Sequence, residues 1–388
     1  MDDSLIRDFE GIYHFPPEVY SSAPGRINII GEHTDYNLGY VLPSAIDLRV
    51  SFLASKRTDG KVCVWAKNFR QEQSFSLYEL EASDQKGWID YIKGIYWILR
   101  EKGAGLQGIN ALVHGNIPLG SGLSSSAAYE VSVLNALDEL FELQIAPLEM
   151  ARLAQKAEND FVGVKCGLMD QFISVFGRKN KAVFLDCETL EFAYIPLRLE
   201  KEGLGILVCD TGIRRELSLS EYNARRLEAS EALESLRKFG PKKYKDLDLQ
   251  ALEERRGDLD GIFFKRARHV LTENARVKQA VSSLQRDDFV GLGKLLFQSH
   301  ESLRDDYEVS CPELDLLYVC GKRYPSCLGA RLTGAGFGGS GIALVRKEGI
   351  PAFKQMILKE AKRRGFPQPA FYEVKIGEGR RIHRYKVD

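Results

Sequence analysis

Short runs of apolar and β-branched residues recur through the first 210 positions and predict strands. These runs are RVSFLAS (49–55), KVCVWA (61–66), INALVHG (109–115), KAVFLDC (181–187), FAYIPL (192–197) and LGILVCD (204–210). Longer segments with apolar residues at helical spacing alternate with them, such as WIDYIKGIYWILREKG (88–103) and SAAYEVSVLNALDELFEL (126–143). This mixture of periods indicates an α+β fold.

The second half of the chain has a different texture. From about Glu221 to Gln298 it is charged and helix-rich, and EYNARRLEASEALESLRKF (221–239) is its clearest amphipathic segment. The tail AFYEVKIGEGRRIHRYKV (370–387) again has the pattern of strand and turn, and could join either half. Because 388 residues exceed what one core usually organises, we expect two lobes, residues 1–198 and 199–388.

Composition narrows the range of partners. The chain has 54 Lys and Arg against 54 Asp and Glu, so it has no net charge to attract nucleic acid or an anionic membrane, and a small-molecule partner is favoured. The N-terminus lacks a signal-peptide pattern and no apolar run approaches the roughly 20 residues of a spanning helix, so we expect a cytoplasmic protein. The seven cysteines have no paired C-x-x-C spacing and are expected to be small buried hydrophobes.

The stretch PGRINIIGEHTDYNLGYVLP (24–43) carries the densest polar cluster of the chain. Its first half has the β-branched pattern of a strand, and six hydrogen-bonding side chains then follow in a row from 32 to 37. Glu32, His33 and Asp35 are possible metal ligands, but their spacing does not fit the common zinc patterns. We therefore expect this cluster to hydrogen-bond a polyhydroxyl compound.

A glycine-rich loop precedes a predicted helix in GNIPLGSGLSSSAAYEVSVLNAL (115–137). Gly120 and Gly122 permit a tight loop, and the serines 124–126 lie where the amphipathic helix begins, so its free N–H groups can receive an anion. No lysine lies in the loop, which excludes the common G-x-x-x-x-G-K-[ST] phosphate loop. A metal ion would have to offset phosphate charge, with serine hydroxyls as plausible ligands. A simple helix cap remains the alternative for this stretch alone.

Two further stretches contain candidate chemistry. RLTGAGFGGSGIALV (331–345) includes a formal G-x-G-x-x-G, which raises the possibility of an NAD-dependent oxidoreductase. That motif requires a helix after the loop, whereas 341–345 is short and β-rich, so we predict a strand, a loop and a second strand. AENDFVGVKCGLMDQFISVFG (157–177) places Glu158 and Asp170 among small and apolar residues, where each is either structurally paired or chemically used.

These stretches, in this order, resemble the GHMP kinases, and GRINIIGEHTDYNLGYVLP resembles the signature of their galactokinase branch. SEYNARR (220–226) and SHESLRDDYEVSCPELD (299–315) extend the resemblance to nearly the whole chain. It implies a two-lobed α+β kinase with its active site in the cleft between the lobes. It also implies ATP-dependent phosphorylation of the anomeric hydroxyl of D-galactose, with Mg²⁺ as cofactor, in a monomer that needs neither nucleic acid nor membrane.

The resemblance assigns roles residue by residue. Galactose would be bound by Glu32, His33, Asp35, Gly167 and Tyr222, while Arg26 and Asp170 would flank the reacting hydroxyl. The residues expected around the ATP phosphates are Gly120, Ser121, Gly122, Leu123, Ser124, Ser125, Ser126 and Ala127. Ser126 and Glu158 would hold Mg²⁺. The second lobe would contribute a glycine loop containing Gly334, Gly336 and Gly338.

Three points remain open at this stage. Asp170 could accept the proton of the sugar hydroxyl, or could orient that hydroxyl while Arg26 and Mg²⁺ stabilise the moving phosphoryl charge. The substrate could be N-acetylgalactosamine or another galactose-like sugar. The chain could also be a non-catalytic galactose sensor on the same fold, although such sensors have lost part of the phosphate loop and here Ser124–Ala128 is complete.

Overall fold

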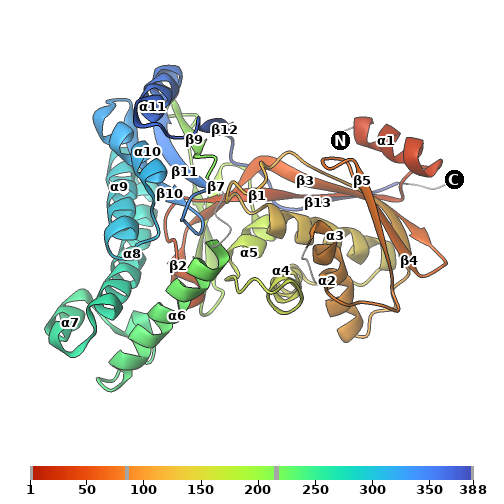
Figure 1. Cartoon of the computed structure of the whole chain (residues 1–388), viewed down its shortest axis with the longest axis horizontal. Coiled ribbons are helices and arrows are strands. Elements are labelled where there is room, and N and C mark those ends of the chain that lie inside the picture. The colour runs from red at the N-terminus through yellow and green to blue at the C-terminus, as the bar shows by residue number, and fades with distance from the viewer. Residues whose placement is uncertain (1–2, 84–86, 214–217, 386–388) are drawn as a thin grey trace.

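The computed structural model describes residues 3–83, 87–213 and 218–385. In this part of the chain the strands form three sheets with helices packed around them (Figure 1). The expected α+β class is therefore confirmed. Among the described helices, none combines the length and the apolar composition that crossing a membrane would require.

The first sheet has six strands in the order β13-β1-β3-β6-β4-β5. Their bounds are β13 (Arg381–Arg384), β1 (Val19–Asn28), β3 (Pro43–Arg57), β6 (Gly108–Gly115), β4 (Lys61–Ala66) and β5 (Gln71–Ser76). Neighbouring strands are antiparallel, apart from the parallel pair β4 and β6. Because β13 pairs with β1, the last part of the tail returns to this sheet, whereas its first part, 370–374, joins the second sheet. Both ends of the chain lie on the same side of the molecule (Figure 1).

Helices cover both faces of this sheet. One face packs against helices from the first half of the chain: α2 (Trp88–Glu101), α3 (Ser125–Phe141), α4 (Pro147–Lys156) and α5 (Met169–Phe176). The other face carries α1 (Asp3–Tyr13), whose Leu5 and Phe9 pack on Leu53 of β3. The side chains of a strand alternate between its faces, and accordingly Phe52 and Ala54 join the larger core.

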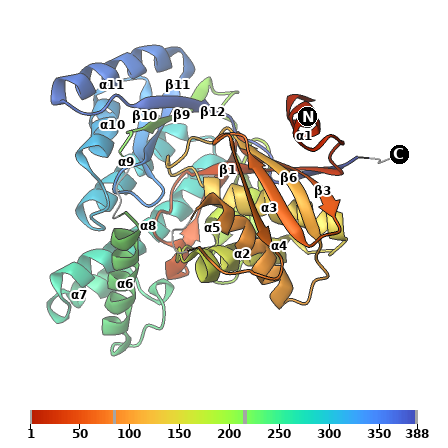
Figure 2. The ribbon, with the colours of Figure 1, turned by 45° about the vertical axis from the view of Figure 1, so that its right-hand side comes forward.

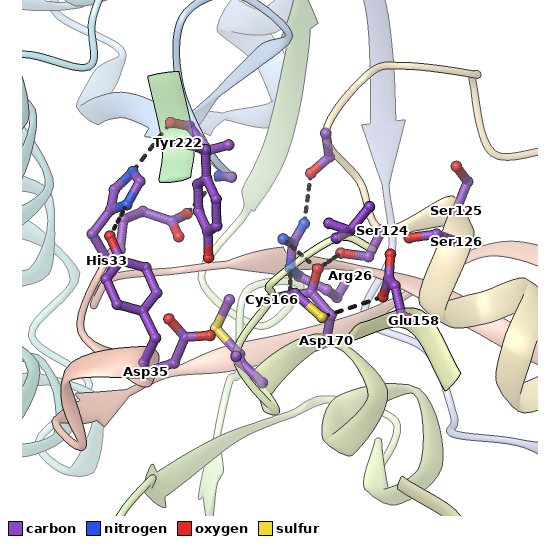
Figure 3. Close-up of a pocket in the computed structure, with 18 of the residues that line it drawn as sticks. Arg26, His33, Asp35, Ser124, Ser125, Ser126, Glu158, Cys166, Asp170 and Tyr222 are labelled. Carbon is purple, nitrogen blue, oxygen red and sulfur yellow. Dashed lines mark hydrogen bonds and ion pairs between the residues drawn. The ribbon is translucent and has the colours of Figure 1, made fainter. Parts of the chain in front are cut away.

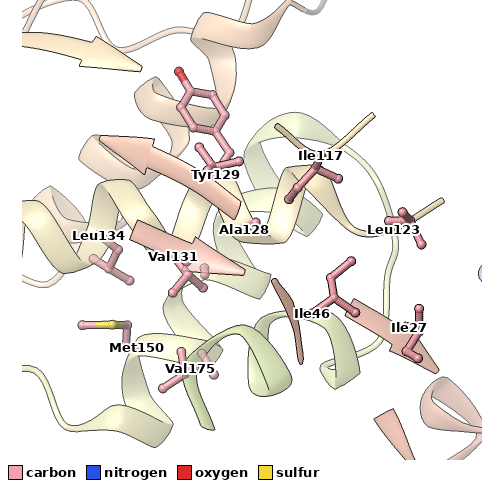
Figure 4. Packing of buried hydrophobic residues seen from close by; sticks show 14 of the residues in the cluster. Ile27, Ile46, Ile117, Leu123, Ala128, Tyr129, Val131, Leu134, Met150 and Val175 are labelled. Atoms are coloured by element: carbon pink, nitrogen blue, oxygen red, sulfur yellow. The ribbon is translucent and has the colours of Figure 1, made fainter. Parts of the chain in front are cut away.

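Helix α3 is buried on all sides instead of being amphipathic as the sequence suggested. Every residue from Ala127 to Leu137 is buried. The reason is tertiary: β1 and β3 contact α3 on one side, and α2, α4 and α5 contact it on the others. Figure 4 shows Val131 and Leu134 of α3 near Met150 of α4 and Val175 of α5 in the same cluster. The middle of α3 therefore has no solvent face, while Ser125 and Ser126 at its N-terminus are partly exposed and can meet a ligand.

The second sheet has four antiparallel strands in the order β10-β11-β9-β12. Their bounds are β10 (Cys327–Thr333), β11 (Ser340–Arg346), β9 (Leu204–Asp210) and β12 (Ala370–Val374). Strand β10 is followed by the glycine loop and then directly by β11, so the predicted strand, loop and strand are confirmed and the dinucleotide fingerprint is excluded. A third, small sheet contains β2 (Tyr40–Val41), β7 (Lys181–Asp186) and β8 (Phe192–Pro196).

The remaining helices surround the second sheet and extend beyond it. They are α6 (Ser218–Arg237), α7 (Leu249–Glu254), α8 (Gly261–Gln285), α9 (Phe289–Asp305), α10 (Pro312–Arg323) and α11 (Ile350–Arg364). Figure 2 shows α6 and α7 together, far from α11. The lobe boundary between residues 198 and 199 stays a prediction, and the largest hydrophobic cluster has members on both sides of it, such as Val131 and Val208.

Candidate active site

One pocket gathers residues from most of the motifs that the sequence singled out. The elements that line it are β1, the turn after it, the loop before α3, the segment 158–170, α6 and the loop between β10 and β11 (Figure 3). The expected site residues that line it are Arg26, Glu32, His33, Asp35, Gly120, Gly122, Ser124, Ser125, Ser126, Glu158, Gly167, Asp170, Tyr222 and Gly334.

Arg26 and Asp170 form a two-point ion pair in this pocket. Nε of Arg26 donates to Oδ1 of Asp170 at 2.8 Å, and Nη2 donates to Oδ2 at 2.9 Å. The hydroxyl of Ser124 also donates to Oδ2. The Asp170 side chain is 24% exposed while that of Arg26 is 6% exposed. The carboxylate is therefore held in one orientation and remains open to the pocket.

The same arginine holds the loop before α3. Its Nη1 donates to the carbonyl of Gly122 at 2.6 Å, and its backbone N–H donates to the carbonyl of Leu123 at 3.0 Å. Gly122 and Ser124 have φ angles of 75° and 60°, which bend the chain into the start of α3. Because the first N–H groups of a helix have no partner within it, this end of α3 is suited to an anion.

The second glycine loop approaches the first one backbone to backbone. Gly334 has φ +84°, and a Cβ atom there would lie 3.1 Å from the carbonyl oxygen of Gly122. A side chain at this position would thus be both conformationally strained and tightly placed. The two loops from distant parts of the sequence close one side of the pocket.

Glu32 joins the polar turn to the second sheet. Its Oε1 accepts from the backbone N–H of Gly334 at 2.7 Å and from Thr333 Oγ1 at 3.0 Å. Arg331 is fully buried beside it, with Nη2 3.4 Å from Oε1. The Nη1 atom of Arg331 donates to the carbonyls of Asn28 and Ile29 at 2.9 and 3.1 Å. One oxygen of Glu32 is therefore used to assemble the site.

His33 is held by partners at both ring nitrogens. Its Nε2 donates to the carbonyl of Ala335 at 3.1 Å, because a carbonyl oxygen can only accept. Burial lowers the pKa of His33 to about 3, so the ring is neutral and Nδ1 accepts from the hydroxyl of Tyr36 at 2.6 Å. Tyr222 of α6 lies nearby, with its ring centroid 5.7 Å from that of His33. A sugar contact by His33 stays a prediction, because a sugar hydroxyl would have to replace Tyr36 or Ala335 as the partner of a ring nitrogen.

Asp35 lies against the backbone of Gly167. A Cβ atom at Gly167 would be 1.8 Å from Oδ2 of Asp35, so no side chain fits there without displacing the carboxylate. Burial, followed by the negative charge of Asp170, raises the pKa of Asp35 to about 7. The two carboxylates thus share one region of the pocket, where Asp170 is paired with Arg26 and Asp35 is buried beside the negative charge of Asp170.

Glu158 occupies a π-helical turn, Ala157–Val162, after α4. It is 5% exposed, and its Oε2 accepts from Gln171 Nε2 at 2.6 Å and from Cys166 Sγ at 3.3 Å. Burial raises the pKa of its carboxyl, while the hydroxyl of Ser126 acts in the opposite direction. A cation placed between Ser126 and Glu158 would meet oxygen donors of the kind that Mg²⁺ prefers.

Charge in the pocket is consistent with such a cation. Of the described residues that line it, Arg26 is the only Lys or Arg, and Asp170 already engages it. Within the described ranges, no group of three or more His, Cys, Asp or Glu side chains could hold a metal ion. A cation would therefore take further ligands from a bound substrate or from water.

An apolar pocket continues from the loop before α3. It shares Ser125, Ser126 and Val164 with the first pocket and is otherwise mainly apolar and aromatic. The rings of Phe69 and Trp88 stack there with centroids 6.4 Å apart. Sequence reasoning missed this pocket because its lining comes from separate segments near 66–69, 87–91 and 113–119 that contain no shared motif.

Some of the expected site residues do not line the first pocket. Ser121, Leu123, Ala127, Gly336 and Gly338 are not among the described residues that line the first pocket. The side chains of Leu123 and Ala127 are buried, and Ser121 Oγ donates to the carbonyl of Pro118 at 2.6 Å. Their roles stay predictions. The residues that line the pocket without having been expected are Tyr36, Val164, Cys166, Met169 and Ala335.

Family patterns match three parts of the chain. The galactokinase galactose-binding signature matches residues 7–56, the GHMP kinases N terminal domain matches 90–178, and the GHMP kinases C terminal pattern matches 280–362. The first contains the polar turn, and the second contains the loop before α3 together with Glu158 and Asp170.

Individual relatives are similar along almost the whole chain. A galactokinase of Staphylococcus carnosus is 43% identical over 388 residues, which covers 97% of this chain and 98% of the relative. A galactokinase of Pyrococcus furiosus is 42% identical, with 92% and 97% covered.

Solved structures of related kinases are also similar to this chain. The crystal structure of Lactococcus lactis galactokinase complexed with galactose has a TM-score of 0.93 and 39% identity, and covers 98% of this chain and 99% of that one. A mevalonate kinase structure, at 19% identity and a TM-score of 0.64, shares the fold. The chain therefore belongs to the galactokinase branch of the GHMP kinases.

Proposed function

We propose that the chain transfers the γ-phosphoryl group of ATP to the anomeric hydroxyl of D-galactose, which yields galactose 1-phosphate and ADP. The observation that carries this proposal is the Arg26–Asp170 pair, which lies in one pocket with both the polar turn and the start of α3. Such a pair is suited to act on a hydroxyl where a polyol site meets a phosphate site.

The sugar would lie against the turn that follows β1. Asp35, Tyr222 and the backbone at Gly167 line the pocket there, and Glu32 and His33 are fastened on the side of the second glycine loop. A buried polar group that remains unpaired costs about 1–3 kcal/mol, so a rigid set of such groups can discriminate the axial 4-hydroxyl of galactose from the equatorial one of glucose.

Phosphoryl transfer would take place between the start of α3 and Asp170. The N–H groups there would face the phosphates, and Arg26 lies within reach of charge that develops on the transferred group. Asp170 is held by Arg26 and Ser124, which suits it to align the anomeric hydroxyl. As that hydroxyl becomes acidic late in transfer, the same carboxylate can accept its proton.

Mg²⁺ is the cofactor that fits the remaining oxygen donors. Ser126 and Glu158 would hold it, and it would supply positive charge to offset the triphosphate, since no lysine is among the described residues that line the pocket. The adenine base would occupy the apolar pocket beside Phe69 and Trp88, because a flat aromatic ring gains from stacking and from leaving water.

The test is a coupled assay of ADP release with ATP and a panel of sugars. We expect strong activity with galactose and weak activity with glucose and N-acetylgalactosamine. Robust turnover of N-acetylgalactosamine in place of galactose would favour the alternative substrate. Galactose binding without ADP release would favour a sensor.

A further inference from the structure

The segment SHESLRDDYEVSCPELD (299–315) reaches the pocket only indirectly: Tyr307 contacts Tyr36 and His33, which line it, with its hydroxyl 3.0 Å from that of Tyr36 and its ring centroid 4.8 Å from that of His33. It covers the end of α9 and the beginning of α10, and none of its residues is among those lining the pocket. Yet its polar residues Ser299, His300 and Ser302 are buried, at 0%, 0% and 7% exposure. Buried polar groups need hydrogen-bond partners. The partners of the two serines are side chains that in turn contact the polar turn.

Side chains of α8 hydrogen-bond the backbone of that turn at three points. Oε1 of Glu273 accepts from the N–H of Gly31 at 2.9 Å, and Nε2 of His269 donates to the carbonyl of Glu32 at 3.1 Å. Oδ1 of Asn274 accepts from the N–H of Tyr40 at 2.8 Å. Because residues four apart share a helix face, His269 and Glu273 reach the turn together. Both ends of the turn are thus fastened to α8.

Helix α9 supports the two α8 residues from the other side. The hydroxyl of Ser299 donates to Oε1 of Glu273 at 2.6 Å. The hydroxyl of Ser302 lies 2.9 Å from Nδ1 of His269, which is left as an acceptor once Nε2 donates to Glu32. The two serines are three residues apart and also share a helix face. The same chain of contacts therefore occurs twice: a serine of α9 hydrogen-bonds a side chain of α8, and that side chain hydrogen-bonds the backbone of the turn.

The backbone of the turn lies directly on α8, without room for adjustment. A Cβ atom at Gly31, where φ is +103°, would lie 2.9 Å from Cγ2 of Val277. A Cβ atom at Gly39 would lie 2.4 Å from Oδ1 of Asn274. These glycines let the backbone approach the helix closely enough for the hydrogen bonds to form.

Glu273 retains its charge in this setting. Burial is the largest single influence and would raise the pKa, but Arg276, His269, Arg331 and the hydroxyl of Ser299 together outweigh it, and the pKa falls to about 2. Nε of Arg276 donates to Oε2 of Glu273 at 2.7 Å. The bond from Gly31 to Glu273 is therefore charge-assisted, which makes it stronger than a bond between neutral groups.

We propose that His269 and Glu273, supported by Ser302 and Ser299, are positioning residues for sugar recognition. They act on the backbone of the turn and so determine where Glu32, His33 and Asp35 lie. The inference rests on the proposed function and adds that affinity for the sugar depends on side chains that line no part of its pocket.

A matched pair of substitutions at residue 269 separates positioning from packing. Gln places a donor near the position of Nε2, so His269→Gln can still donate to the carbonyl of Glu32. Asn is shorter and reaches only the position of Nδ1, so His269→Asn loses that bond. We expect KM for galactose within about twofold of wild type in His269→Gln and raised about tenfold in His269→Asn, one hydrogen bond being worth about that factor. KM for ATP should stay within about twofold in both.

Two substitutions test the Glu273 arm. Glu273→Gln keeps an acceptor for Gly31 but loses the charge, and Ser299→Ala removes only the support. We expect KM for galactose to rise about tenfold and about threefold, respectively, with KM for ATP little changed. Should Glu273→Gln fail to fold, Ser299→Ala still carries the test. Asp138→Asn is the control, since Oδ1 of Asp138 also accepts from a backbone N–H, that of Ile145 at 2.9 Å, far from the turn.

The outcomes distinguish this inference from the proposed function. If the wild type does not phosphorylate galactose, the proposed function fails. If the wild type is active, and His269→Asn and Ser299→Ala lower thermal stability while KM for galactose stays at the wild-type value, the residues are merely structural and the inference is overturned. An equal rise of KM for galactose and for ATP would also overturn it.

Discussion

The carboxylate of Asp35 occupies the space that a side chain at Gly167 would need. A Cβ atom at Gly167 would lie 1.8 Å from Oδ2 and 2.4 Å from Cγ of Asp35. The turn after β1 and the segment before α5 therefore fit together only because residue 167 is a glycine. The position of Asp35 in the pocket depends on this contact.

Gly167→Ala should displace Asp35 and weaken sugar binding. We expect KM for galactose to rise by about tenfold or more, while KM for ATP changes little, since the clash lies on the sugar side of the pocket. Steady-state kinetics with each substrate varied in turn will measure this. Gly105→Ala is the matched control, because a Cβ atom there meets nothing within 4 Å. A normal KM for galactose in Gly167→Ala would argue against contact between Asp35 and the sugar.

Asp170→Asn should act on the transfer step. Loss of a proton-accepting or orienting group usually costs about 10²–10⁴ in rate, so we expect kcat to fall at least about 100-fold with KM for ATP within about threefold. Thermal denaturation must accompany the kinetics, because the substitution also removes the ion pair with Arg26. Turnover close to that of the wild type would remove Asp170 from the mechanism.

Glu158→Gln should weaken the binding of Mg²⁺ and leave the fold intact. Replacing a carboxylate oxygen by a neutral amide lowers attraction for a divalent cation, so the Mg²⁺ concentration for half-maximal rate should rise about tenfold. A titration of rate against Mg²⁺ at saturating substrates measures it. Glu149→Gln serves as control, since that side chain is partly exposed and pairs with Lys102 on the surface. An unchanged titration would make Glu158 structural.

Asp35→Asn should change how stability depends on pH. The pKa of Asp35 rises from 3.8 to about 7 in the folded protein, so between these values the folded state holds a proton that the unfolded chain releases. That contribution is present at low pH and is lost as pH rises through 7. Asn cannot ionise, so the melting temperature of the variant relative to wild type should increase from pH 5 to pH 8, by about 1–4 °C. A constant difference across this range would contradict the raised pKa.

Trp88→Ala should weaken nucleotide binding selectively. Its ring stacks with Phe69 in the apolar pocket next to Ser125 and Ser126, where adenine is proposed to lie. We expect KM for ATP to rise about 5- to 30-fold, with KM for galactose unchanged. If only KM for galactose responds, the adenine is elsewhere.

Elements with a clear local period were predictable. KVCVWA coincides with β4 (Lys61–Ala66), and WIDYIKGIYWILREKG contains α2 (Trp88–Glu101). The failure of the dinucleotide motif was also visible, because the residues after the glycines have the pattern of a strand. In each case the information is carried by residues a few positions apart, which is the range over which periodicity acts.

Other features depended on packing between distant segments. Helix α3 was expected to have a solvent face, but strands and helices cover it on every side. The aromatic pocket around Trp88 is assembled from separate segments, and those that carry Phe69 and Trp88 belong to no motif. The positioning role of α8 was equally hidden, since nothing near Glu273 in sequence indicates a contact with Gly31 242 positions away.

The sequence by itself determined which residues are available for chemistry: a polar turn, a glycine loop at a helix start, and isolated acids in apolar surroundings. Only the tertiary structure decided that they meet in one pocket, that Oε1 of Glu32 is used by Gly334 and that both nitrogens of His33 are partnered. The physical reason is range. Local periodicity follows from neighbouring residues, whereas a hydrogen bond across 302 positions depends on how whole sheets and helices pack.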